Sequence, residues 1–215
     1  MPTTSVHGNL VLPQIVGTQP NGTGRVFFVV PLDHLDLGLI IKPDELHVEL
    51  RLLLLGSLGL LLDLPVDFFT SAIHASGHDV RDGRLAVGVI FLPRTDLGGQ
   101  DACRTIVEAV LIRAGLFVYG WRQVPVDIKA LGKKAIATRP EIEQIMFSMP
   151  VEMDATDAER QLYIVRRRIE KAVIRDMISD FYLCSLSSRS IIYKGMFLAE
   201  QVTAFFPDLL DQRFH

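Results

Sequence analysis

The sequence predicts an α+β fold in which strands and helices are mixed and do not alternate regularly. Leu85–Leu92 is a short, continuous apolar run, which is typical of a buried strand. Two longer segments, 100–114 and 157–178, repeat apolar residues at helical spacing. The short apolar runs 181–186 and 190–193 predict two strands joined as a hairpin. Hairpins combined with long helices favour a layered α+β fold over a doubly wound sheet.

Composition narrows the class of protein. The chain has 215 residues, of which 49% are hydrophobic and 22% charged, as expected for one globular domain. A net charge of -3 does not favour binding to nucleic acid or to an anionic membrane. The segment Met1–His7 lacks the charged and apolar regions of a signal peptide, and Leu52–Leu64 is too short to span a bilayer. Since two cysteines are too few for a disulfide framework, we expect a soluble, cytoplasmic protein.

The helix over 157–178 is the most strongly specified element. Thr156 and Glu159 match the T-x-x-E capping box, which satisfies free backbone N–H groups at a helix start. The helix over 100–114 ends at Gly115, a residue favoured at helix C-termini. Both helices should bury one apolar stripe. The predicted stripe residues are Cys103, Ile106, Val107, Val110, Leu111 and Ala114 in one helix and Leu162, Val165, Ile169, Ala172, Val173 and Met177 in the other.

Shorter elements complete the prediction. They are helices over Pro65–His74 and Leu198–Phe206 and strands over Phe117–Val124 and Glu141–Ser148.

The chain divides at about residue 64. Residues 1–24 are rich in Thr, Gly, Pro and Asn and predict irregular chain, and Arg25–Val30 predicts a strand. Leu52–Leu62 has neither helical nor strand periodicity. It is interpreted as a buried strand pair, as a leucine-rich helix, or as a segment whose original coding sense has been lost. We therefore divide the chain into an atypical leader, 1–63, and a patterned domain, 64–215.

The patterned domain contains blocks specific enough to identify a family. Residues 84–93 are similar to the motif YAVGMVFLP, 120–127 to GWRxVPVD, and 167–172 to RRxIEKA. Further similar blocks cover 131–144, 181–200 and 206–214, in the same order and spacing. Over about 150 residues the chain thus resembles an interior part of the glutamine amidotransferase domain of glutamate synthase.

This resemblance implies a fold and a reaction. The fold would be an N-terminal nucleophile-type layered αββα sandwich, here incomplete. Such domains hydrolyse glutamine to glutamate and ammonia. The ammonia passes to a separate synthase domain, which carries FMN and an iron–sulfur cluster and aminates 2-oxoglutarate. The implied partners are those remaining domains, with glutamine as substrate and neither nucleic acid nor membrane.

The catalytic motifs of the family have no counterpart in this chain. The family nucleophile is an N-terminal cysteine whose own amino group is the base, whereas no cysteine precedes Cys103. Residues 55–59 keep one glycine of the motif GDGAG, and 32–36 match HRG only at a single position. The motifs RYSTNT and HNGEIN would follow Phe214. We therefore assign no catalytic, cofactor-binding or metal-binding residue.

The cysteines and two of the histidines favour structural interpretations. Cys103 lies on an apolar helix stripe and Cys184 inside a strand, so both are expected to be small core residues. His74 and His78 are four residues apart like a zinc pair, but Gly77 should end the helix between them and no third ligand is suitably placed.

Two polar motifs also favour a structural interpretation over a binding or catalytic one. Arg166–Arg168 could suggest a phosphate or nucleic-acid site, but a solvated helix face with an Arg166–Glu170 pair is favoured. Ser187–Arg189 is predicted to be a β-turn and not a reactive serine turn, because it lacks the G-x-S-x-G context.

Three functional hypotheses follow. The favoured one is an inactive remnant of a glutamine amidotransferase domain. The second is one piece of a split synthase that needs a partner chain for the nucleophile. The third is a non-catalytic binding or regulatory module that kept the fold.

Overall fold

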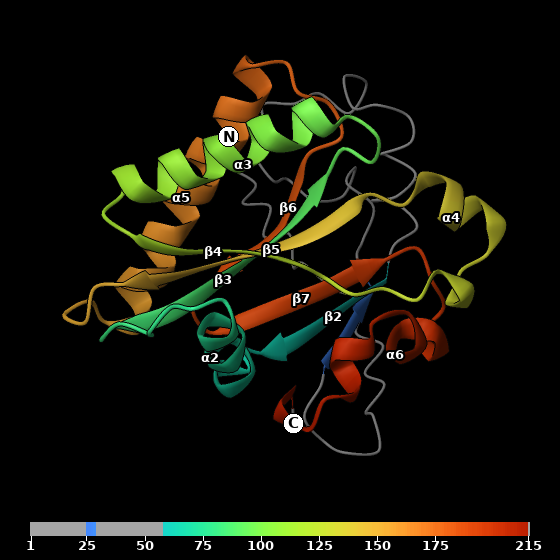
Figure 1. Ribbon diagram of the computed structural model, residues 1–215, viewed down its shortest axis with the longest axis horizontal. Helices are drawn as coiled ribbons and strands as arrows, with labels where there is room; N and C mark the ends of the chain where they lie inside the picture. The colour runs from blue at the N-terminus through green and yellow to red at the C-terminus, as the bar shows by residue number, and fades with distance from the viewer. Residues whose placement is uncertain (1–24, 29–57, 215) are drawn as a thin grey trace, which may run out of the picture.

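The computed structural model describes residues 25–28 and 58–214 and shows an α+β fold built on two antiparallel sheets (Figure 1). The predicted irregular segment 1–24, the end of the first predicted strand at 29–30, and residues 52–57 of the leucine-rich segment lie outside the described residues. The mixture of strands and helices confirms the predicted fold class.

The larger sheet has four strands in the order β4-β5-β3-β6, and all neighbours are antiparallel. In β3, Val87 and Val89 face one core, whereas Ala86 and Ile90 face another. Because both faces of the strand are buried, its sequence is apolar throughout, as predicted. The strands are β3 (Arg84–Leu92), β4 (Phe117–Gln123), β5 (Glu141–Met149) and β6 (Tyr182–Ser187).

The smaller sheet has the order β1-β2-β7. Its strands are β1 (Arg25–Phe28), β2 (Leu58–Asp63) and β7 (Ser190–Gly195). The leucine-rich segment therefore ends in a strand, as one of its interpretations required. The predicted hairpin of β6 and β7 is wrong in one respect: both strands form, but β6 pairs with β3 and β7 pairs with β2. The turn at 188–189 thus carries the chain from one sheet to the other.

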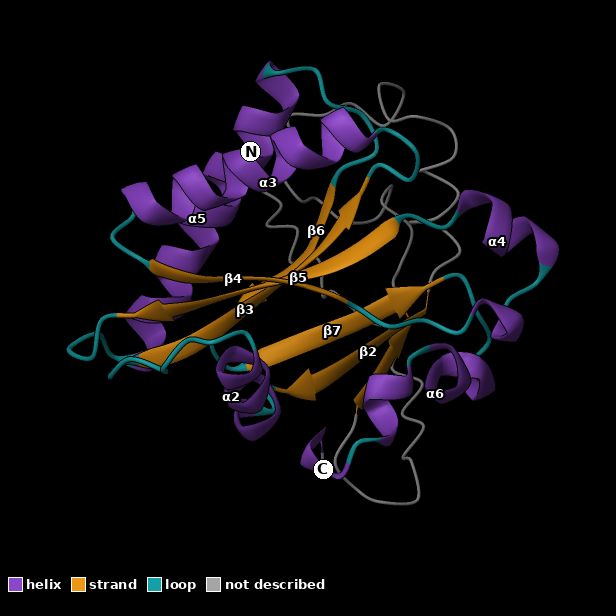
Figure 2. Cartoon of the chain, in the orientation of Figure 1, coloured by secondary structure: helices purple, strands orange, loops and turns teal. Residues whose placement is uncertain are grey.

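Two long helices cover one face of the four-stranded sheet (Figure 2). They are α3 (Leu97–Arg113) and α5 (Ala155–Arg175). The predicted apolar stripes pack there against Ile90 and Phe147, except that Ala172 is half-buried and outside this core and Met177 is 90% exposed. Met177 lies beyond the end of α5 and has a φ of 53°, which turns the chain away from the helical path.

The start of α5 corrects the predicted capping box. Asp154 is the N-cap, and its Oδ1 accepts hydrogen bonds from the amides of Thr156 and Asp157 at 2.6 and 3.0 Å. A carboxylate at this position satisfies the free N–H groups and also interacts favourably with the helix dipole. Glu159 is therefore not needed for capping and makes contacts elsewhere.

A second core joins the two sheets and contains Leu60, Val87, Tyr119, Ile191 and Tyr193. Two short helices, α2 (Val66–Ala75) and α6 (Val202–Phe205), cover its rim, and a third, α4 (Lys133–Thr138), contributes no residue to it. Single 3-10 turns occur at 128–130, 199–201, 207–210 and 212–214. The helix predicted over 198–206 is thus a 3-10 turn followed by α6, and α4 was not predicted.

Candidate functional site

Four polar side chains from separate elements meet beside the core that joins the two sheets. Arg122 on β4 donates to both carboxylate oxygens of Asp208, at 2.7 and 2.6 Å. It also donates to Oε1 of Gln144 at 2.8 Å. Gln144 donates to the hydroxyl of Tyr193, which donates to Oδ2 of Asp208, both at 3.0 Å. The four side chains form a closed ring of hydrogen bonds, here called the inter-sheet ring.

The inter-sheet ring is arranged for structure and not for proton transfer. Burial, reinforced by the negative charge of Asp208, raises the pKa of Tyr193, so the phenol stays protonated and remains a donor. The Arg122 guanidinium also lies over the ring of Phe68, with 5.0 Å between the guanidinium carbon and the ring centroid. Each polar group is satisfied by another member of the ring, so none is free to act as a general acid or base.

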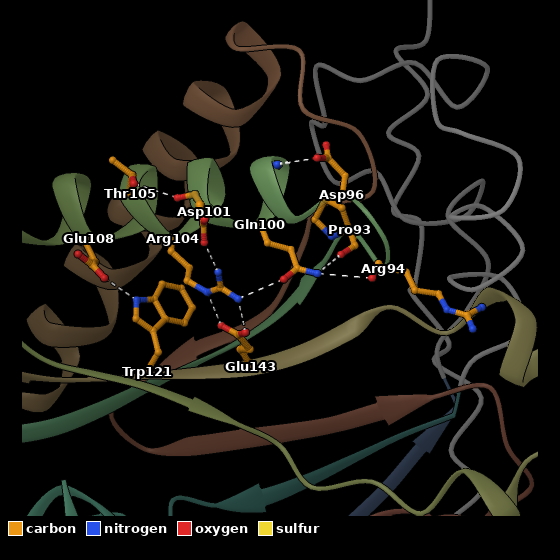
Figure 3. Close-up of polar contacts among 11 residues, drawn as sticks. Pro93, Arg94, Asp96, Gln100, Asp101, Arg104, Thr105, Glu108, Trp121 and Glu143 are labelled. Carbon is orange, nitrogen blue, oxygen red and sulfur yellow. Dashed lines mark hydrogen bonds and ion pairs between the residues drawn. The ribbon is translucent and has the colours of Figure 1, made fainter.

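A second polar cluster lies between α3 and β5, on the other face of the four-stranded sheet (Figure 3). Arg104 forms a bidentate pair with Glu143, with distances of 2.8 and 2.5 Å, and a further bond to Asp101 at 2.6 Å. Its hydrogen bond to Glu143 raises the pKa of Arg104, which keeps the guanidinium charged. Trp121 donates to Glu108 at 2.6 Å beside it. These contacts attach the helix to the sheet.

The turn between β6 and β7 is held by Glu159 of α5. Its Oε1 accepts from the Ser187 hydroxyl at 3.1 Å and from the amide and hydroxyl of Ser188, both at 2.8 Å. This confirms the interpretation of Ser187–Arg189 as a turn. It also shows what Glu159 does in place of capping its own helix.

Both cysteines are buried thiols. Cys103 has no exposed surface, and burial raises its pKa to about 12. Cys184 is 5% exposed, its pKa is raised to about 11 by burial, and its thiol donates to the carbonyl of Ile192 at 3.7 Å. Since the thiolate is the nucleophile, neither side chain is activated at neutral pH. The prediction that both are core residues is confirmed.

The two histidines do not form a metal pair. The helix α2 ends at Ala75, and Gly77 has a φ of 84°, so His78 lies past the helix end as predicted. Nδ1 of His78 lies 3.4 Å from the hydroxyl of Ser76. Within residues 25–28 and 58–214, no three His, Cys, Asp or Glu side chains are grouped so that they could hold a metal ion.

The arginine run on α5 differs partly from its prediction. Arg166 pairs with Glu170 at 2.9 Å, as expected. However, Arg166 is half-buried, because its Nη2 also donates to the carbonyl of Leu183 on β6 at 2.5 Å. Arg168 is exposed. The run therefore supports the edge of the sheet through Arg166 and is not simply a solvated face.

Lys194 on β7 was missed in the sequence. It is only 3% exposed, and its Nζ lies 3.3 Å from the hydroxyl of Tyr182 and 4.8 Å from the centre of that ring. Burial lowers its pKa. A lysine inside the apolar run Ser190-Ile-Ile-Tyr-Lys-Gly195 is a signal that could have singled it out. The members of the inter-sheet ring carry no such local signal.

None of the helices in the described part of the chain is both long and apolar enough to cross a membrane.

Comparisons with known proteins point to one family. Residues 56–215 match the family model of the class-II glutamine amidotransferases. The chain is 54% identical over 156 residues to the glutamate synthase [NADPH] large chain of Azospirillum brasilense. This match covers 73% of this chain and 10% of the relative. It is 38% identical to ferredoxin-dependent glutamate synthase 1 of Arabidopsis thaliana, over 72% of this chain and 10% of the relative. The chain therefore spans about a tenth of the length of these relatives.

Proposed function

This chain belongs to the class-II glutamine amidotransferases, and from that premise we propose that it is an interior part of the glutamine-hydrolysing domain of a glutamate synthase. In the whole enzyme, this domain would release ammonia from glutamine for glutamate formation from 2-oxoglutarate. The similarity to glutamate synthase large chains over 73% of the chain supports the proposal. Two unpaired cysteines fit the reducing cytoplasm, where we place the protein.

The finer fold is part of the same proposal. We assign the chain to the N-terminal nucleophile-type αββα sandwich. Two antiparallel sheets packed through one core, with α3 and α5 on the outer face of one sheet, support this assignment.

FMN and an iron–sulfur cluster would belong to the other domains of the synthase. Cysteine thiolates hold such clusters, and the two cysteines described above lie in different cores, Cys103 in one and Cys184 in the other. These residues do not fit a cluster, so no step is assigned to one in this chain.

The role of the chain would be to supply the scaffold, and it would be inactive alone. The observation that carries this is the state of its cysteines, since both are protonated in apolar surroundings. Incubation with glutamine should release no glutamate above a blank. A glutamine analogue with an electrophilic diazoketone should label neither cysteine by mass spectrometry. Turnover that disappears in Cys184→Ser or Cys103→Ser would contradict the proposal.

A split synthase is the second candidate, because neither cysteine of the chain is an activated nucleophile. Co-expression with a polypeptide carrying an N-terminal cysteine and the motifs HRG, RYSTNT and HNGEIN should then restore glutaminase activity. If it does not, and if glutamine raises the melting temperature of the chain alone, a non-catalytic binding module is favoured.

A further inference from the structure

Lys194 is a buried amine with no counter-ion among residues 58–214. Its one described polar partner is the Tyr182 hydroxyl, at 3.3 Å. An isolated charge removed from water is costly unless it is paired, so a buried lysine either loses its proton or binds an anion. The surroundings of Lys194 decide between these two states.

The groups around the amine offer donors and positive charge but no free acid. Tyr182 and Cys184 are protonated, since burial raises the pKa of both. Arg166 adds a second positive charge nearby, and its own partner Glu170 is held by Arg166 and Arg167. An ammonium group has three N–H donors, and the Tyr182 oxygen can accept only one of them. If the amine is protonated, its other two donors have no acceptor among residues 58–214.

Lys194 lies opposite a glycine of the neighbouring strand. It is the penultimate residue of β7, and its direct partner on β2 is Gly59. Directly opposed residues of an antiparallel pair project to the same face. Because Gly59 has no side chain, the strand beside Lys194 contributes none to that face at this position.

We propose that Lys194 and the Tyr182 hydroxyl form a binding site for a carboxylate group at this end of β7. The ammonium would make a charge-assisted hydrogen bond to the carboxylate, and the phenol would donate a second one. The carboxylate would belong to a free ligand such as an amino acid. The site does not depend on glutamine hydrolysis.

The test follows the amine directly by NMR. The chain is labelled with ¹³Cε-lysine, and the Lys194 signal is assigned by its loss in Lys194→Arg. The protein is titrated with sodium acetate and with L-glutamate, and with sodium chloride at equal ionic strength as the control. Tyr182→Phe keeps the ring and removes the hydroxyl. Losing a hydrogen bond to a charged group should weaken binding about tenfold.

Each outcome decides the proposal. A saturable shift with acetate or glutamate but not chloride, weakened in Tyr182→Phe, supports a free-ligand site. A signal that no addition moves overturns the proposal, even if it is typical of a charged ammonium up to pH 10. If Lys194 titrates well below the ordinary value of 10.5 and no carboxylate shifts it, the proposal is overturned.

Discussion

Arg122 and Asp208 lie 86 residues apart in the sequence, yet two hydrogen bonds of 2.6 and 2.7 Å join their side chains. The Asp208 side chain is 6% exposed and that of Arg122 is 20% exposed. The pair attaches the C-terminal 3-10 turns to β4 and completes the inter-sheet ring.

Asp208→Asn should destabilise the protein strongly. Breaking a largely buried pair leaves an uncompensated charge on Arg122, and we expect the free energy of unfolding to fall by about 2–4 kcal/mol. Chemical denaturation measures the change. The matched control is Arg160→Gln, which removes an exposed pair with Asp157 and should leave the midpoint unchanged. Equal effects of the two substitutions would show that the Arg122–Asp208 pair contributes no more to stability than an exposed pair does.

Tyr193→Phe tests the same ring at another member. It removes the acceptor of the fully buried Gln144 amide and a donor to Asp208, at a cost of about 1–3 kcal/mol in unfolding free energy. Because the residues share partners, the double variant with Asp208→Asn should lose less than the sum of the single losses. Strict additivity would mean that the ring does not act as a unit.

Glu159→Ala should loosen the turn between β6 and β7. Three hydrogen bonds to Ser187 and Ser188 disappear, and the unfolding free energy should drop by about 1–3 kcal/mol. Hydrogen exchange should accelerate at the Ser188 amide and not at α3, to which the structure shows no hydrogen bond from Glu159. Unchanged exchange at Ser188 would refute the assigned role.

Gly88 is expected to tolerate no side chain. A Cβ at this position would lie 2.9 Å from Ile145 Cγ2 and from Leu186 Cδ1. Gly88→Ala should therefore overpack the core and cost about 1–3 kcal/mol in unfolding free energy. Gly132→Ala is the control, because an added Cβ there meets no atom within 4 Å. Thermal melts of the two variants should differ clearly, and similar melting temperatures would contradict the packing at Gly88.

The thiol of Cys103 predicts a pH effect on stability. Its ordinary pKa of 9.0 rises to about 12 on folding, so between these values the unfolded state binds fewer protons and stability falls as pH rises. The contribution is complete below pH 9 and is lost toward pH 12. The stability gap between wild type and Cys103→Ala should therefore narrow from about pH 7.5 to about pH 10.5. Val107→Ala removes no titrating group. The difference in unfolding free energy between wild type and this variant should therefore stay constant over the same pH range.

Local patterns predicted most of the described elements. The apolar run of β3 and the stripes of α3 and α5 were correct because burial repeats at the period of each structure. The cap of α5 was wrong because both Asp154 and Thr156 are good cap residues, and local sequence does not show that Glu159 is used by a turn elsewhere.

The polar sites could not be predicted in the same way. Arg122 and Asp208 occur in separate blocks of the family resemblance, and no spacing rule connects them. Likewise the runs of β6 and β7 predict strands but do not reveal that each pairs in a different sheet. Such pairings depend on long-range packing, which single-sequence periodicity does not contain.

The strand order has a consequence for biosynthesis. Val87 of β3 pairs with Met146 on one side and Ser187 on the other, so the centre of the larger sheet forms only after most of the chain has been made. Contacts this distant in sequence slow folding, and an apolar strand waiting for its neighbours is prone to aggregate. During translation β3 is thus a segment that would benefit from protection by a chaperone.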